Sequence, residues 1–333
     1  MTALEDFAAQ VGPVGAGPVT CVGGRTQWEL GGGLTGAPRE VMAPAGVVGH
    51  QPGEMIVRVR AATTLAALDE ATAAGGQIVA LEADQPERAT VGGVLACGRS
   101  GLRRLGRGPV RDALLEATWV NADGEVVRAG APLVKNVTGF DLCRLMVGSI
   151  GTLGFLAEVV LRCHPRPERE EWWRSEPDSD ADAFALYRAL YRPLAVLWDG
   201  RSVWVGLTGY GADVDAQVRG VLEPAGRWSQ VEGPPSPVGE LRRSVPAAEL
   251  RATLDAVSAS CPGSSWLAEI GVGVLHCSAE AARVVPAPPP GAGVVELHRR
   301  IKERFDPEGR LNPGRSPLTH PQVMAAASRG ASA

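Results

Sequence analysis

The stretch Lys135-Asn-Val-Thr-Gly-Phe-Asp-Leu-Cys-Arg-Leu-Met-Val-Gly-Ser-Ile-Gly-Thr-Leu-Gly154 carries the most specific pattern in the chain. It ends in a glycine cluster with interleaved hydroxyl residues, Gly148-Ser-Ile-Gly-Thr-Leu-Gly154, which opens a predicted strand over 153–162. That strand stops at His164-Pro-Arg-Pro167, because proline cannot donate to the ladder of a sheet. Glycines at such a place let the backbone turn sharply or approach another group closely.

Two further glycine clusters lie upstream, each beside a predicted strand. The first is Val22-Gly-Gly-Arg-Thr-Gln27, and consecutive glycines let successive backbone N–H groups face one concavity that can hold an anion. The second joins Thr90-Val-Gly-Gly93 to Cys97-Gly-Arg-Ser-Gly101. One such cluster is a weak signal, because glycine pairs are common in plain turns. Three of them together favour a phosphate-bearing cofactor.

Periodicity divides the chain into two predicted domains and a tail. Alternating strand-like and helix-like segments fill the first part, with strands at 55–60 and 77–81, a helix at 65–74 and a hairpin at 118–127. The prolines at 164–167 and the charged run after them mark a boundary. Beyond it, a helix, a hairpin, two helices, a strand segment and a final helix over 294–305 predict a small α+β layer. The predicted domains are 1–165 and 166–320, followed by a disordered tail over 321–333.

Composition limits the class of protein. With 333 residues and 45% hydrophobic content, the chain is long enough for two domains, and its net charge of −4 gives no basic excess for nucleic acid. No run of 18 apolar residues predicts a membrane span. The N-terminus does not resemble a secretory signal, so we expect a cytoplasmic location, with peripheral attachment to the inner face of the membrane left open through partners. The six scattered cysteines predict neither disulfides nor a zinc or iron–sulfur site.

Residues 86–167 resemble the FAD-binding domain of the vanillyl-alcohol oxidase/PCMH flavoproteins. Within that superfamily the stretch 135–154, the run 89–101 and Val110-Arg-Asp112 are similar to the FAD-binding subunits of glycolate oxidases. The ending Phe305-Asp-Pro-Glu-Gly-Arg-Leu-Asn-Pro-Gly-Arg315 is typical of the wider group. The resemblance implies an α+β fold, in which a PCMH-type FAD-binding domain of two α/β subdomains precedes a small α+β cap domain.

The resemblance also implies which residues hold FAD. The first loop, residues 23–27, would wrap the diphosphate. The second loop, residues 84–93, would meet the diphosphate and the ribityl chain. The later segments would lie beside the ribityl, adenine and flavin parts of FAD. These positions are Gly23, Gly24, Arg25, Thr26 and Gln27; Asp84, Thr90, Gly92 and Gly93; Gly98, Ser100 and Gly101; Ile150, Gly151 and Gly154; and Asn312. Relatives usually carry Thr directly after the glycines, so Arg25 is a departure. The first loop has no histidine for a covalent tether, which predicts non-covalent FAD.

The catalytic groups stay unassigned. Catalytic relatives carry a Gly-Asp-Gly-Asn-Leu-His-like motif, where this chain has Gly271-Val-Gly-Val-Leu-His276. Two valines cannot coordinate a metal or orient a hydroxy acid, so we expect a buried strand and an ordinary hydrogen-bonded histidine. Lys135 is one of only two lysines and is either functional or a surface partner of Asp141.

Two functions of different classes follow from the resemblance. In the first, the chain is a flavin-carrying subunit of a glycolate-oxidase-like complex. It would relay electrons between a catalytic flavoprotein subunit and an iron–sulfur subunit, for a complex that oxidises a small 2-hydroxy acid. In the second, it is a stand-alone FAD-dependent dehydrogenase or oxidase of a hydroxy acid or alcohol. The short second domain favours the first.

Overall fold

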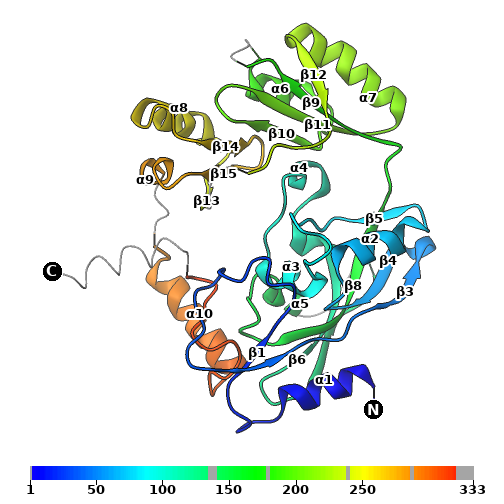
Figure 1. Cartoon of the computed structure of the whole chain (residues 1–333), viewed down its shortest axis with the longest axis vertical. Helices are drawn as coiled ribbons and strands as arrows, with labels where there is room; N and C mark the ends of the chain where they lie inside the picture. The colour runs from blue at the N-terminus through cyan, green and yellow to red at the C-terminus, as the bar shows by residue number, and fades with distance from the viewer. Residues whose placement is uncertain (1, 134–140, 178–180, 238–240, 286–288, 320–333) are drawn as a thin grey trace, which may run out of the picture. The chain divides into compact units, whose positions relative to one another are not determined.

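The computed structural model describes residues 2–133, 141–177, 181–237, 241–285 and 289–319. Contacts divide the chain into two compact units (Figure 1). Unit 1 comprises Met1–Gly101, Pro109–Arg166 and Pro290–Ala333, and unit 2 comprises Leu102–Gly108 and Pro167–Pro289. The chain therefore leaves unit 1 near the predicted boundary but returns to it at Pro290, whereas the prediction kept everything up to residue 320 in the second domain. The predicted tail and Lys135 lie outside the described residues.

Unit 1 contains two sheets. The small one pairs β1 (Val19–Cys21) in parallel with β2 (Arg39–Val41). The larger one is antiparallel and has the order β3-β4-β8-β6-β7, with β5 added beside β8. Its strands are β3 (Val47–Gln51), β4 (Ile56–Arg60), β5 (Gln77–Val79), β6 (Leu114–Val120), β7 (Val126–Gly130) and β8 (Phe155–Pro165). The predicted strands at 55–60 and 77–81 and the hairpin at 118–127 are present as β4, β5 and the β6–β7 pair.

Threonine side chains cap the starts of the first two helices of unit 1. Thr2 and Thr64 accept backbone N–H groups at the starts of α1 and α2, which satisfies donors that a helix leaves unpaired. The predicted helix at 65–74 is α2. Unit 1 also has 3-10 helices at Pro52–Glu54 and Val110–Ala113. Its α-helices are α1 (Ala3–Val11), α2 (Leu65–Ala73), α3 (Val91–Cys97), α5 (Leu142–Met146) and α10 (Ala292–Phe305).

The glycine pair in the second predicted loop lies inside α3 and not in a loop. Glycine costs about 1 kcal/mol in a helix relative to alanine, which is why the sequence suggested a turn. The Thr90 side chain accepts the Gly93 N–H at 3.2 Å and starts the helix nevertheless. The helix ends at Gly98, whose φ of 65° is the left-handed conformation that favours glycine.

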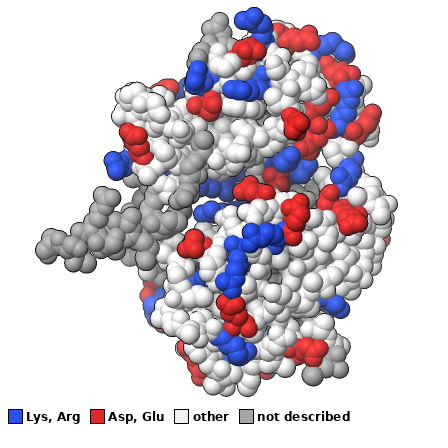
Figure 2. Space-filling view, in the orientation of Figure 1, with Lys and Arg blue, Asp and Glu red and all other residues white. Residues whose placement is uncertain are grey.

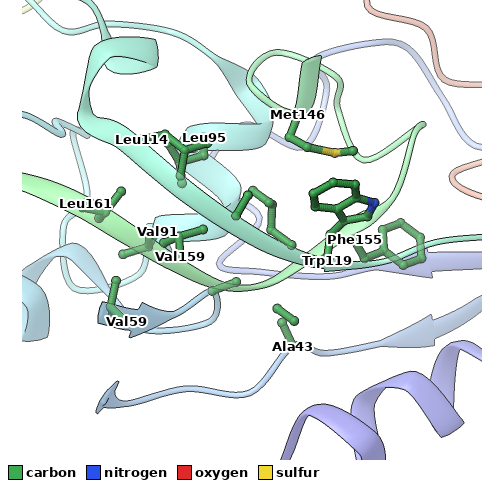
Figure 3. Close-up of a cluster of buried hydrophobic side chains, with 14 of the residues drawn as sticks. Ala43, Val59, Val91, Leu95, Leu114, Trp119, Met146, Phe155, Val159 and Leu161 are labelled. Atoms are coloured by element: carbon green, nitrogen blue, oxygen red, sulfur yellow. The ribbon is translucent and has the colours of Figure 1, made fainter. Parts of the chain in front are cut away.

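The core of unit 1 lies between its larger sheet and its helices. Trp119 and Val159 of the sheet pack with Leu95 of α3 and Met146 of α5, and all four are almost fully buried (Figure 3). Gly154 permits this packing, because a Cβ there would lie 2.4 Å from Cδ1 of Trp119. The specific stretch found in the sequence thus ends where the chain enters the core strand β8.

Unit 2 is built on one seven-stranded antiparallel sheet with the order β12-β9-β11-β10-β14-β15-β13. Its strands are β9 (Arg169–Ser175), β10 (Ala195–Trp198), β11 (Val203–Gly209), β12 (Trp228–Val231), β13 (Leu241–Ser244), β14 (Trp266–Glu269) and β15 (Val274–Cys277). Its helices are α4 (Arg104–Arg107), α6 (Ala183–Ala189), α7 (Gly211–Gln217), α8 (Leu250–Ser260) and α9 (Ala281–Val284), with a short π-helix at Val218–Leu222 and a 3-10 helix at Glu223–Ala225.

The two faces of this sheet bury different side chains. One face packs against α6, α7, α8 and α9 around residues such as Val205 and Leu254 (Figure 1). The opposite face carries a smaller apolar cluster that includes Leu197, Trp204 and Leu267. Alternation along each strand produces this separation, because successive side chains point to opposite faces.

Acidic and basic side chains are interspersed on the face of the molecule drawn in Figure 2, which agrees with the small net charge. In the part of the chain that the structure describes, no helix is both long and apolar enough to span a membrane.

Candidate functional site

The first glycine loop leaves β1 and packs closely against the segment that precedes α3. A Cβ at Gly23 would lie 2.6 Å from Oγ1 of Thr90, and one at Gly24 would lie 1.8 Å from the carbonyl oxygen of Arg88. A side chain at Gly24 would therefore push against backbone, and one at Gly23 would have to displace the Thr90 side chain. Arg25, the departure noted in the sequence, adopts the left-handed conformation with a φ of 55°. The loop is therefore held in one conformation by its neighbours.

The backbone N–H groups of this loop have no partner in the part of the chain that the structure describes. Among the described residues, none accepts a hydrogen bond from the N–H of Gly23, Gly24, Arg25, Thr26 or Gln27. A left-handed residue within a run of free N–H groups is a feature of backbone concavities that bind phosphate. By contrast, Gly92 donates its N–H to the carbonyl of Ala61 at 2.8 Å, and Gly93 donates to Thr90. Among the described residues, the first loop therefore offers N–H donors without a partner, whereas Gly92 and Gly93 of the second do not.

Three arginines lie beside the same loop, two of them on the ring of Trp28 and the third on Gln27. The Cζ atoms of Arg25 and Arg315 lie 4.6 and 4.0 Å from the centre of the Trp28 ring. Arg315 donates from Nη2 to the Trp28 carbonyl at 2.8 Å, and Arg99 donates from Nη1 to Oε1 of Gln27 at 3.2 Å. Arg25 also pairs with Glu40 at 2.6 Å.

The guanidinium groups of Arg99 and Arg315 are partly buried, and Glu29 is the carboxylate whose charge acts on Arg315. Within the described residues, neither Arg99 nor Arg315 forms an ion pair, and Nε of Arg315 is buried with no hydrogen-bond partner. Burial lowers the pKa of both groups, because desolvation disfavours their charged form. The nearby Cys97 has its thiol pKa raised, mainly by burial. Partly buried positive charge, without a close ion pair among the described residues and beside N–H groups that have no described partner, fits an anion such as a diphosphate.

Asn312 joins the C-terminal segment to the glycine segment before β8. Its Nδ2 donates to the carbonyl of Ile150 at 2.6 Å, and its Oδ1 accepts from Thr20 at 2.6 Å. Both Asn312 and Ile150 have positive φ, and a Cβ on Gly151 would lie 2.7 Å from Nδ2 of Asn312. The buried Asn312 side chain is therefore a clamp between β1 and the 148–154 segment.

The remaining predicted positions lie either near the first loop and Asn312 or away from them. Gly98 packs against Gly148, with its Cβ position 2.8 Å from the Gly148 Cα. Ser100 accepts the Val110 N–H at 3.1 Å, and Gly101 lies against Glu82. Asp84 is exposed. Contacts thus link the first loop to the start of α3, and link Ile150 and Gly151 to Asn312, whereas Gly154 belongs to the core. Sequence reasoning missed Trp28, Arg99 and Arg315 as site residues, although Arg315 closes the recognised C-terminal ending.

A second polar cluster lies in unit 2. His276 is on β15, as expected for a strand residue, and its Nε2 is 2.8 Å from Oε1 of Glu269 on β14. Arg242 on β13 approaches the same oxygen at 3.5 Å. Glu269 is almost fully buried, and its Oε2 has no hydrogen-bond partner among the described residues. Within the described residues, no group of three or more His, Cys, Asp or Glu side chains could hold a metal ion.

Comparison with known proteins connects the chain to FAD-binding proteins. Residues 15–130 match the family model of an FAD binding domain. The chain is 30% identical over 326 residues to glycolate oxidase subunit GlcE of Escherichia coli (strain K12), covering 90% of this chain and 92% of that protein. It is 33% identical over 157 residues to a D-lactate dehydrogenase of Anaerostipes hadrus, covering 45% of this chain and 32% of that protein.

One further relative matches a short part of the sequence, and one solved structure matches most of the fold. Glycolate oxidase subunit GlcD of Bacillus subtilis (strain 168) is 42% identical over 82 residues, which are 25% of this chain and 17% of that protein. The structure superposes on an alkyldihydroxyacetonephosphate synthase with a TM-score of 0.69 and 14% identity, covering 93% of this chain and 73% of that chain. At this identity the structural likeness establishes the fold alone.

Proposed function

Because the chain belongs to the family of FAD-binding oxidoreductases that includes glycolate oxidase subunit GlcE, we propose that it is the FAD-carrying subunit of a complex that oxidises a small 2-hydroxy acid. In that complex it relays electrons between a catalytic flavoprotein subunit and an iron–sulfur subunit. The scattered cysteines support placing the cluster on a partner. When bound, FAD supplies the redox centre of the subunit.

The observation that carries this proposal is the set of backbone N–H groups in the first loop of unit 1 that have no partner among the described residues. The free N–H groups from Gly23 to Gln27 and the guanidinium groups of Arg99 and Arg315 match the charge and the acceptor oxygens of the FAD diphosphate. These residues would hold the diphosphate, and the buried Nε of Arg315 would gain a partner. We assign the FAD domain to unit 1 and the cap domain to unit 2.

We assign non-covalent FAD on chemical grounds. The first loop contains no histidine, and the nearby Cys97 thiol has a raised pKa, so little reactive thiolate forms near neutral pH. Denaturation in acid should release all of the flavin into the supernatant. Flavin that stays with the precipitated chain would contradict this assignment.

Purification of the chain alone and with its partner subunits tests the proposed function. We expect a yellow protein that reduces no dye with glycolate or lactate by itself and does so once the partners are added. A colourless protein without measurable affinity for FAD would refute the proposal.

The second candidate function is a stand-alone FAD-dependent dehydrogenase or oxidase of a hydroxy acid. The polar cluster on β13, β14 and β15 favours it, because this cluster offers a cation and a histidine, which hydroxy-acid oxidation needs. Robust turnover of glycolate or lactate by the chain alone would establish this candidate over the first.

A further inference from the structure

We propose that Trp28 is a positioning residue, whose ring holds the guanidinium groups of Arg25 and Arg315 in place for the FAD diphosphate. The inference rests on the proposed function for its ligand, and on the contacts of Trp28 for the role of the ring. Trp28 does not itself pair the phosphate oxygens, and it acts through the two arginines.

Two consecutive turns fix the backbone of Trp28 directly after the first loop. The Leu30 N–H donates to the carbonyl of Gln27 at 3.2 Å, so Trp28 lies inside a tight turn. In the next turn the Gly32 N–H donates to the carbonyl of Glu29 at 3.3 Å. The ring is therefore attached to a backbone segment with a defined conformation.

The C-terminal ending of the chain brings Arg315 to this turn. The Ser316 N–H donates to the carbonyl of Gly31 at 2.9 Å, and the Arg315 N–H donates to the carbonyl of Asn312 at 3.1 Å. At its other end, Arg315 donates from Nη2 to the Trp28 carbonyl at 2.8 Å, and its Cζ lies 4.0 Å from the ring centre. Trp28 thus holds this guanidinium group both by its carbonyl and by its ring.

Arg25 reaches the same ring from within the first loop. Its Cζ lies 4.6 Å from the ring centre, and its Nη2 donates to both carboxylate oxygens of Glu40 at 2.6 and 2.7 Å. The side chains of Arg25 and Glu40 are 44% and 54% exposed, and an exposed ion pair of this kind contributes little to holding a side chain. The ring of Trp28 is therefore a significant restraint on Arg25.

Two cations over one ring repel each other, and the ring offsets that repulsion. Burial lowers the pKa of Arg315, and the like charge of Arg25 adds to this effect. The face of an aromatic ring is electronegative, and Trp attracts cations more strongly than Tyr or Phe does. The indole can thus keep both guanidinium groups near one point before an anion arrives. A diphosphate would then supply negative charge to both of them.

Arg315 has a donor that the rest of the chain leaves unused. Its Nε is buried and has no hydrogen-bond partner among the described residues, although buried polar groups are normally paired. The guanidinium group is thus held by Nη2 and by the ring, while Nε stays without an acceptor. This is the arrangement expected of a group that is positioned for a ligand.

Titration of the apoprotein with FAD, followed by flavin fluorescence, tests the role of the ring. Trp28→Leu keeps an apolar side chain and removes the ring face, so the Kd should rise about five- to thirty-fold. Trp28→Phe keeps a weaker ring face and should lose less affinity. Trp173→Leu is the matched control, because Trp173 is also partly buried and no guanidinium group lies over its ring among the described residues. It should bind FAD as the parent does.

Two further measurements separate positioning of the cations from packing of the loop. A tetrafluorinated tryptophan at position 28 keeps the shape of the ring without its electronegative face, and it should raise the Kd as well. It decides the question even if Trp28→Leu unfolds, which thermal unfolding of each apoprotein would show. Trp28→Leu should also cost clearly less affinity in an Arg315→Gln chain than in the parent, because one of the cations that the ring holds is gone.

The outcomes for Trp28 and for the proposed function are distinct. If the parent binds FAD and Trp28→Leu binds it equally well, the role of Trp28 is overturned alone. An equal loss in the Arg315→Gln chain, or a fluorinated ring that leaves the Kd unchanged, would overturn it too, and would indicate a ring that stacks on the adenine of FAD or merely packs. A parent chain without measurable affinity for FAD refutes the proposed function instead.

Discussion

Substitution of Gly24 by alanine tests whether the first loop is fixed in a conformation that binds the diphosphate. A Cβ at this position would lie 1.8 Å from the carbonyl oxygen of Arg88 and 2.5 Å from its carbonyl carbon. Real Cβ atoms essentially never come closer than 3.0 Å to a heavy atom outside their own and the adjacent residues, so the two backbone segments must separate by more than 1 Å. Both segments are backbone, so no flexible side chain can absorb the movement.

The expected magnitude follows from this displacement. Overpacking that forces backbone shifts costs about 1–3 kcal/mol. Because the displaced loop carries the free N–H groups, we expect most of that cost in FAD binding, as a Kd raised about ten- to a hundred-fold. Gly33→Ala is the control, because a Cβ there has no heavy atom within 4 Å.

Flavin fluorescence titration of the apoprotein would measure the Kd, and thermal unfolding of the same apoprotein would show whether the fold is affected. The reasoning is refuted if Gly24→Ala binds FAD as tightly as the parent. It is equally refuted if Gly33→Ala loses as much affinity.

Four other predictions concern unit 1. Arg315→Gln should raise the Kd for FAD and reduce its dependence on NaCl concentration, because one buried cation is removed; an unchanged salt dependence would argue against a role at the diphosphate. Thr90→Ala should lower the stability of the apoprotein by about 1 kcal/mol in chemical denaturation through the lost cap of α3, and Thr90→Ser should restore it. Lys302→Met should cost about 3–5 kcal/mol in the same assay, because it leaves the fully buried carboxylate of Asp306 without its cation; a loss no larger than that of Arg304→Met, at an exposed position of the same helix, would contradict this. Because burial raises the pKa of Cys97, its thiolate forms only above the usual pH range, so mass spectrometry at pH 8 should find slower alkylation in the folded than in the unfolded chain.

Local pattern was sufficient to predict the parts of the fold that depend on neighbouring residues. The strand β4, the helix α2 and the β6–β7 hairpin follow from alternation, a threonine cap and an Asp-Gly turn. Helix α3 was missed, because the capping of Gly93 by Thr90 outweighs the weak helix propensity of two glycines.

The candidate site was predictable only in part. Its glycines and the C-terminal ending could be recognised from the sequence, because two backbone segments that approach closely leave room only for glycine. The stacking of Arg25 and Arg315 on Trp28 does not appear, since it joins positions far apart in the chain. The Glu269–His276 pair was missed for a related reason. Strand register decides that contact, and register depends on tertiary packing.

The hydrogen bond between Thr20 and Asn312 spans 292 positions of the chain, and β1 forms a parallel bridge with Leu311 beside it. On a ribosome that adds roughly 5–20 residues per second, the first loop therefore exists for about 15–60 s before its C-terminal clamp is made. Unit 2 is synthesised entirely within that interval. The proposed diphosphate site is thus completed late in synthesis, because its clamp forms only after the segment that carries Asn312 has emerged.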